Sequence, residues 1–120
     1  IHGADGLDEI TVARETIVAE VSRNRYKTFT VEPETFGLKR GRIEHLQVES
    51  ADESAKIVLE VLQSKRRDEA RSLVVINAAA AIYLGGLARD LSHAARLAEQ
   101  AIDSGQAEHK LDRLIQTTNK

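Results

Sequence analysis

The chain has 120 residues, of which 42% are hydrophobic and 30% charged, and its formal net charge is −2. This length and apolar content suit one domain with a hydrophobic core, and the near-neutral charge excludes a general electrostatic attraction to nucleic acid. Cysteine is absent, which excludes disulfides and thiolate metal sites. No apolar run is long enough to span a bilayer and no signal-peptide pattern is present, so we expect a cytoplasmic protein.

The first ten residues, IHGADGLDEI, carry the most chemical content. Gly3 and Gly6 allow backbone conformations that other residues rarely adopt, so the segment is predicted to bend sharply. Asp8 and Glu9 would point to opposite faces of a regular strand, but in a bent loop both carboxylates can turn toward one point. Such a pair suits Mg²⁺, which is usually held by one or two carboxylates together with waters and substrate phosphates. The alternative is a solvated acidic turn that leads into a strand.

A β-hairpin is predicted next. Residues 16–21 and 26–31 are rich in β-branched and aromatic side chains, and the polar residues 22–25 between them are predicted to form a four-residue loop. Thr11 and Val12 are predicted to continue a short strand that precedes the hairpin. Pro33 follows the second strand and ends it, because proline has no N–H to donate to a β-ladder.

The rest of the chain is predicted to be helical after an irregular connector at 34–49, in which 42–46 has the character of a helical turn. Ser50 and Glu53 have the spacing of a capping box, which predicts the start of the first helix. The helix over 69–84 is apolar around most of its circumference, as is typical of a buried helix, and its alanines allow close approach of neighbours. Two further helices are predicted over about 92–103 and 106–116 from their apolar periodicity.

Other residues that resemble ligands have simpler structural explanations. His2 has a side-chain pKa near neutrality and suits a phosphate contact or an acid, but a hydrogen-bonded structural role is favoured. Asp5 is predicted to support the loop by accepting backbone N–H groups. The basic run 65–67 has acidic neighbours and no interleaved aromatic residues, so it is interpreted as a solvated helix junction. Asn77 lies in an apolar helix and is predicted to make a buried hydrogen bond.

Four motifs in a fixed order resemble those of anthranilate phosphoribosyltransferases. They are HGADGLDEI at 2–10, PETFGL at 33–38, INAAAAIY at 76–83, and AIDSG at 101–105 followed by KL at 110–111. The resemblance implies an α/β fold, the C-terminal portion of a phosphoribosyltransferase and nucleoside phosphorylase-like domain, with a hairpin followed by about four helices. It also implies a pentosyltransferase that uses phosphoribosyl pyrophosphate and anthranilate in tryptophan biosynthesis. In the family, the carboxylates that match Asp8 and Glu9 help to hold Mg²⁺.

The same resemblance implies that residues 1–120 are one part of a longer enzyme. The chain has no methionine and begins inside a motif, which also indicates a fragment. The family's pyrophosphate loop GTGGD, its KHGN segment, its anthranilate-binding arginine and the N-terminal helical lobe through which it dimerises have no counterpart in these residues. We therefore expect the chain to be inactive alone and its parent to be a homodimer.

Two departures from the family pattern are visible. Thr35 replaces a usual aspartate, and VESADES at 48–54 replaces a glycine-rich segment that ends in asparagine, so a close backbone approach at that loop is not expected. Two other interpretations remain open. One is a same-fold relative, such as a pyrimidine nucleoside phosphorylase or a paralogue without the transferase activity. The other is a free-standing interaction module whose helices bind a partner.

Overall fold

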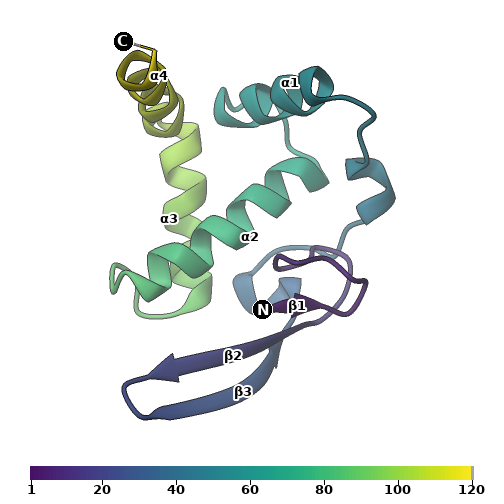
Figure 1. Ribbon diagram of the computed structural model, residues 1–120, viewed down its shortest axis with the longest axis vertical. Helices are drawn as coiled ribbons and strands as arrows, with labels where there is room; N and C mark the ends of the chain where they lie inside the picture. The colour runs from purple at the N-terminus through teal and green to yellow at the C-terminus, as the bar shows by residue number, and fades with distance from the viewer. Residues whose placement is uncertain (120) are drawn as a thin grey trace.

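A computed structural model describes residues 1–119, and Figure 1 shows the order of its elements. The strands are β1 (His2–Gly3), β2 (Thr16–Ser22) and β3 (Arg25–Val31). Two 3₁₀ turns follow, η1 (Pro33–Phe36) and η2 (Ile43–Leu46), and then the helices α1 (Ala51–Leu62), α2 (Glu69–Leu84), α3 (Leu91–Asp103) and α4 (Gln106–Thr118). The predicted hairpin and four helices are thus present. Within residues 1–119, no helix combines the length and apolar character needed to cross a membrane.

The sheet is antiparallel in the order β1-β2-β3. β2 and β3 pair over their whole length, with Thr16 opposite Val31 and Ser22 opposite Arg25. The connection is therefore a two-residue turn, and the predicted four-residue loop was wrong because Ser22 and Arg25 belong to the ladder. Arg23 adopts a φ of 52°, an uncommon conformation for a residue other than glycine, and this closes the turn.

Residues 11 and 12 were also predicted wrongly, because they lie in the loop between β1 and β2 and form no strand. Thr11 and Val12 have no solvent-exposed surface, so their β-branched side chains fill the core from an irregular segment. The connector after the hairpin agrees better with its prediction, since η2 occupies the segment expected to form a helical turn.

Helix α1 begins as the sequence predicts, with a variation in the cap. The Ser50 hydroxyl accepts the Glu53 N–H at 3.1 Å. The Glu53 carboxylate, however, accepts the N–H of Glu49 at 3.0 Å, one residue before the cap, so the reciprocal bond of a capping box is displaced by one position.

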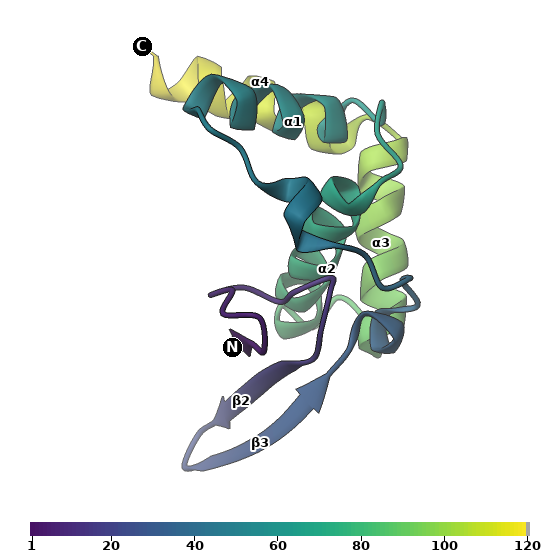
Figure 2. The same cartoon turned by 90° about the vertical axis from the view of Figure 1, so that its right-hand side faces the viewer.

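The core forms where α2 crosses α3 (Figures 1 and 2). The 3₁₀ turn η1 packs against α3. Small side chains line the crossing, so the two backbones approach closely, as the alanine-rich sequence predicted. Four of these alanines are buried: Ala79, Ala94, Ala95 and Ala98. Larger buried side chains come from the loop, the sheet, η1 and the helices: Ile10, Val12, Val31, Phe36, Val61, Val75, Ile76 and Ile102. This core holds the loop that follows β1 against α2.

Helix α2 ends in a Schellman motif, which explains the glycine pair in the sequence. The Leu87 N–H donates to the Ile82 carbonyl at 3.2 Å, and the Gly86 N–H donates to the Tyr83 carbonyl at 3.0 Å. Gly86 has a φ of 73°, in the left-handed region that favours glycine. The chain reverses there and enters α3 (Figure 2).

The basic run 65–67 lies at the junction of α1, α2 and α3, as predicted, and its arginines are used within the chain. Arg66 pairs with Glu60 at 3.0 Å and with Asp68. Arg67 and the buried Arg71 both pair with Asp103, at 3.1 Å and 3.0 Å. The Arg71 contact is outside hydrogen-bond geometry, so it stabilises the junction by charge.

Asp103 makes this junction sensitive to acid. The Ser64 hydroxyl donates to its carboxylate at 2.6 Å, and this bond together with the charges of Arg71 and Arg67 lowers the pKa of Asp103. Its stabilising contribution is complete above the ordinary aspartate pKa of about 3.9 and is lost as the pH falls further, because the folded state must then bind a proton it disfavours.

We therefore expect the free energy of unfolding to decrease below about pH 4, and to decrease less steeply in Asp103→Asn than in the unsubstituted chain. Urea denaturation at a series of pH values measures both slopes. Asp112→Asn is the matched control, because Asp112 is exposed and forms no ion pair within residues 1–119. Equal acid slopes for Asp103→Asn and Asp112→Asn would contradict the prediction.

Candidate functional site

The loop between β1 and β2 is shaped by its own backbone hydrogen bonds. The Gly3 N–H donates to the Leu7 carbonyl at 2.8 Å, and the Gly6 N–H donates to the Gly3 carbonyl at 2.9 Å. Gly6 has a φ of 92°, so it supplies the predicted bend. A Cβ on the buried Gly3 would lie 2.7 Å from Asp5 Oδ1 and 3.2 Å from the Leu7 carbonyl oxygen. Glycine is therefore needed at position 3 for space and at position 6 for conformation.

Asp5 supports this loop, which confirms its predicted role. Its Oδ1 accepts the Leu7 N–H at 3.3 Å, and its Oδ2 accepts the hydroxyl of Thr11. Thr11 Oγ1 in turn accepts the Ala13 N–H at 3.0 Å, and the Thr11 N–H donates to Thr16 Oγ1 at 3.1 Å. Both threonines are buried, so the network fixes the base of the loop.

Asn77 fixes the other end of the loop to helix α2. Its Oδ1 accepts the Ile10 N–H at 2.9 Å, and its Nδ2 donates to the Ile10 carbonyl at 3.0 Å. The same Nδ2 also donates to the Leu73 carbonyl one turn earlier, at 3.1 Å. The predicted hydrogen bond of Asn77 is thus confirmed as a bidentate bond to Ile10, although it is part-buried and not fully buried as predicted. Its partner is 67 residues away in the sequence.

Asp8 and Glu9 lie between these two fixed points. Both side chains are exposed, and within residues 1–119 neither carboxylate accepts a hydrogen bond or forms an ion pair. Their oxygens are therefore available to a ligand, while the backbone on either side is fixed. No third acidic or histidine side chain in the described part of the chain joins them to enclose a metal ion. Two carboxylates in an open position fit Mg²⁺, which keeps several waters, better than a cation that needs an all-protein cage.

His2 differs from its expected role. It lies in β1 with an exposed side chain, and its imidazole makes no hydrogen bond to any residue that the structure describes. The hydrogen-bonded structural role favoured from the sequence is therefore absent within residues 1–119.

Arginine side chains line a hollow beside the loop, and one of them was missed by sequence reasoning. The Gly41 N–H donates to the Val12 carbonyl at 2.8 Å, which places the connector against the loop. Arg14 and Arg42 line the hollow together with Asp5 and His45. Arg40, by contrast, pairs with Glu32 and Glu34. Arg14 belongs to no sequence motif, and only the folded loop brings it beside Arg42.

Comparison with known proteins agrees with this architecture. Residues 1–108 match the family described as "Glycosyl transferase family, a/b domain". The chain is 41% identical over 120 residues to an anthranilate phosphoribosyltransferase from Nitrosomonas eutropha, a match that covers 100% of this chain and 35% of the relative. The chain thus spans about a third of the length of that relative.

Solved structures give the same result. The chain superimposes on an anthranilate phosphoribosyltransferase from Saccharomyces cerevisiae in complex with 4-fluoroanthranilate, with a TM-score of 0.90 and 27% identity, over 98% of this chain and 34% of the other. A complex of the yeast enzyme with PRPP and Mg gives a TM-score of 0.88 at 27% identity, with the same coverage of each chain. These matches confirm the predicted α/β fold class. The chain belongs to the glycosyl transferase family, a/b domain.

Proposed function

We propose that this chain is part of an anthranilate phosphoribosyltransferase, a pentosyltransferase that transfers phosphoribose from phosphoribosyl pyrophosphate to anthranilate in tryptophan biosynthesis. The observation that carries the proposal is the match along the whole chain to a relative of that name at 41% identity. The yeast complexes with an anthranilate analogue and with PRPP and Mg support the substrates and the metal. In this reaction the anthranilate nitrogen forms a bond to C1 of the ribose, pyrophosphate leaves with the electrons of the C1–O bond, and the amine loses a proton.

We assign Asp8 and Glu9 as the residues that hold Mg²⁺. When bound there, magnesium would neutralise negative charge on the pyrophosphate. The remainder of the loop positions the two carboxylates: Asp5 fixes one side through Leu7, and Asn77 fixes the other through Ile10. Because these bonds fix the backbone on either side of the pair, they hold the two carboxylates in place, and preorganised charge is the most effective kind.

We place the other parts of the active site and the dimer contact outside residues 1–120. The pyrophosphate loop, the anthranilate-binding arginine and the N-terminal helical lobe belong, in this interpretation, to the remaining length of a longer protein, and residues 1–120 are the C-terminal part of its α/β domain. We further propose that this protein is a cytoplasmic homodimer, with its dimer contact in that lobe, and that the chain alone is inactive.

Complementation tests the function. We define the two-chain assembly as this chain co-expressed with the part of the Nitrosomonas eutropha relative that precedes the matched region. The two-chain assembly is expected to consume anthranilate in the presence of phosphoribosyl pyrophosphate and Mg²⁺. Each chain alone is expected to consume no anthranilate. Fluorescence of anthranilate measures the rate.

Other outcomes identify the alternatives. A stable assembly without turnover would point to a same-fold paralogue, and phosphorolysis of pyrimidine nucleosides by the assembly would identify that activity. A monodisperse 120-residue protein that neither assembles nor binds Mg²⁺ would contradict the proposal and favour an independent interaction module.

A further inference from the structure

The buried Thr11 is the centre of the hydrogen-bond network at the base of the loop between β1 and β2. Its Oγ1 accepts the Ala13 N–H at 3.0 Å and donates to Asp5 Oδ2. Because the Ala13 N–H can only donate, the single hydroxyl proton of Thr11 is directed to Asp5. Within residues 1–119 the Asp5 carboxylate accepts hydrogen bonds from Leu7 and Thr11, and of these two residues only Thr11 is buried. Thr11 therefore connects the Asp5 side chain to the core.

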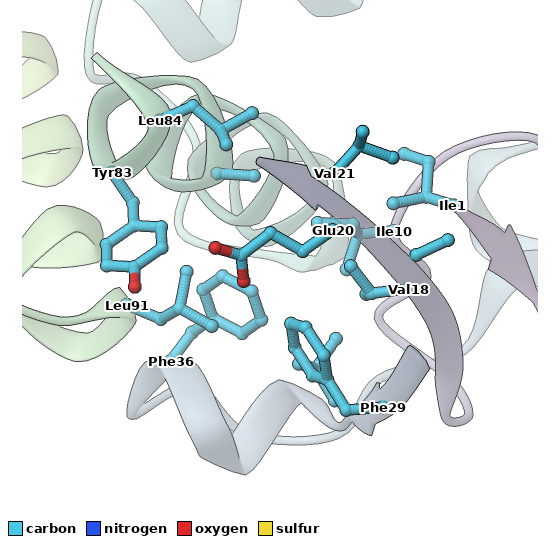
Figure 3. A pocket seen from close by; sticks show the side chains of 13 residues that line it. Ile1, Ile10, Val18, Glu20, Val21, Phe29, Phe36, Tyr83, Leu84 and Leu91 are labelled. Atoms are coloured by element: carbon cyan, nitrogen blue, oxygen red, sulfur yellow. The ribbon is translucent and has the colours of Figure 1, made fainter. Parts of the chain in front are cut away.

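Ile10, the residue before Thr11, is held against α2. Its N–H and its carbonyl are both bonded to Asn77, at 2.9 Å and 3.0 Å. Its side chain is 2% exposed and lines, with Phe36 and Tyr83, an apolar hollow of about 310 Å³ between the hairpin and the end of α2 (Figure 3). Ile10 is thus fixed by its backbone and by its side chain, and the position of Thr11 is fixed with it.

Asp8 and Glu9 lie inside a ring that the threonine hydroxyl closes. The ring spans residues 5–11, from the Asp5 carboxylate to the Thr11 hydroxyl. Neither the Asp8 nor the Glu9 carboxylate accepts a hydrogen bond within the described part of the chain, so the backbone of the ring sets where the two carboxylates lie. Without the bond from Thr11, the Asp5 side of the ring loses its connection to a buried residue.

We propose that Thr11 is a positioning residue for Mg²⁺: by holding Asp5, its hydroxyl keeps the ring in the shape that presents Asp8 and Glu9 to the metal. The role requires the hydroxyl, because a valine of similar size neither donates nor accepts a hydrogen bond. Replacing residues that orient metal ligands typically costs about 10–100-fold in metal affinity or activity. This inference rests on the proposed function, since it takes Asp8 and Glu9 as the residues that hold Mg²⁺.

Metal binding measured without turnover tests the inference. Mn²⁺ is the probe, because carboxylate and water ligands suit Mn²⁺ as well as Mg²⁺, and the electron paramagnetic resonance signal reports the free ion. In the two-chain assembly, Thr11→Val is expected to raise the Mn²⁺ dissociation constant about tenfold. Thr11→Ser, which keeps the hydroxyl, is expected to remain within about threefold of the unsubstituted assembly. Hydrogen exchange of the Leu7 amide is expected to accelerate in Thr11→Val, because the Asp5 carboxylate that accepts it is released.

Two controls assign the effect to the ring. The Mn²⁺ that is bound at the pair is the fraction that Asp8→Asn/Glu9→Gln removes. Ile102→Val shortens a buried side chain in the last turn of α3, so it is expected to lower Tm and to leave the Mn²⁺ dissociation constant unchanged. This variant separates a loss of stability from a loss of positioning.

Each result decides a different point. Equal dissociation constants for the unsubstituted assembly and Thr11→Val would overturn the inference, as would increases of the same size in Thr11→Val and Thr11→Ser, or in Thr11→Val and Ile102→Val. Mn²⁺ binding that depends on Thr11 in an assembly without turnover would reject the transferase activity and leave the role of Thr11 intact. No Mn²⁺ bound at the pair would overturn the assignment of Asp8 and Glu9, and this inference with it.

Discussion

Asp8→Asn/Glu9→Gln is expected to lower kcat/KM of the two-chain assembly by about 100-fold or more. Both substitutions preserve the shape of the side chains and remove the charges that would hold Mg²⁺. Because both carboxylates are exposed and accept no hydrogen bond within residues 1–119, the thermal stability of the chain is expected to change by less than about 0.5 kcal/mol. Steady-state kinetics over a range of Mg²⁺ concentrations measure the first effect, and thermal unfolding measures the second.

A charge-matched control separates metal binding from general electrostatics. Asp52→Asn/Asp112→Asn also removes two exposed carboxylates, from α1 and α4, and is expected to leave the rate unchanged. Partial recovery of the Asp8→Asn/Glu9→Gln rate at high Mg²⁺ would support loss of a ligand. A rate equal to that of the unsubstituted assembly would return the pair to its alternative interpretation, a solvated acidic turn.

Asn77→Ala is expected to have the largest effect on stability, about 3 kcal/mol in the free energy of unfolding and roughly 10 °C in Tm. The substitution removes three hydrogen bonds and leaves the Ile10 N–H and carbonyl groups without their partner. Urea denaturation measures the free energy, and exchange of the Ile10 amide reports the release of the loop. In the two-chain assembly, the same substitution is expected to reduce activity, because Asp8 and Glu9 are no longer held from the α2 side.

Asn119→Ala provides the comparison. The Asn119 side-chain amide also donates to a backbone carbonyl, that of Ile115 at 2.9 Å, but it lies at an exposed helix end. Its cost is expected to remain below about 0.5 kcal/mol. Asn77→Asp adds a second test: it keeps the size of the side chain and the acceptor for the Ile10 N–H, but it places a carboxylate against the Ile10 carbonyl. Similar stabilities for Asn77→Ala and Asn119→Ala would show that the bonds to Ile10 contribute little.

The helices were predictable because their signals are local. Apolar periodicity and caps such as Ser50 act within a few residues, so the predicted extents agree closely with α1 to α4. The family motifs likewise predicted the α/β fold from the sequence alone. The turn of the hairpin was less predictable, because the left-handed conformation falls on Arg23 and not on the neighbouring Asn24, a residue type that adopts it more readily. Thr11 and Val12 have the composition of a strand, but burial in the core determined their conformation.

The site was predictable only in part, for a related reason. The sequence identifies Asp8 and Glu9 as candidate ligands and Asp5 as a supporting residue, since all are close together in the chain. The bond from Asn77 to Ile10 spans 67 residues, and no local pattern reveals its partner. Arg14 is similar, because it reaches the hollow only after the connector packs on the loop. The assignment of the metal ligands remains a prediction until the substitution is measured.

The bond between Asn77 and Ile10 also bears on the order of events during synthesis. A ribosome releases residues in chain order, so Asp8 and Glu9 emerge before α2, which anchors them, has been made. Contacts of large sequence separation form late, because closing the intervening loop costs conformational entropy. Nascent chains arrested before Asn77 would consequently expose the acidic loop to proteases, and chains arrested after α3 has emerged would protect it. The end of the loop that Asn77 anchors is thus translated well before the residue that anchors it.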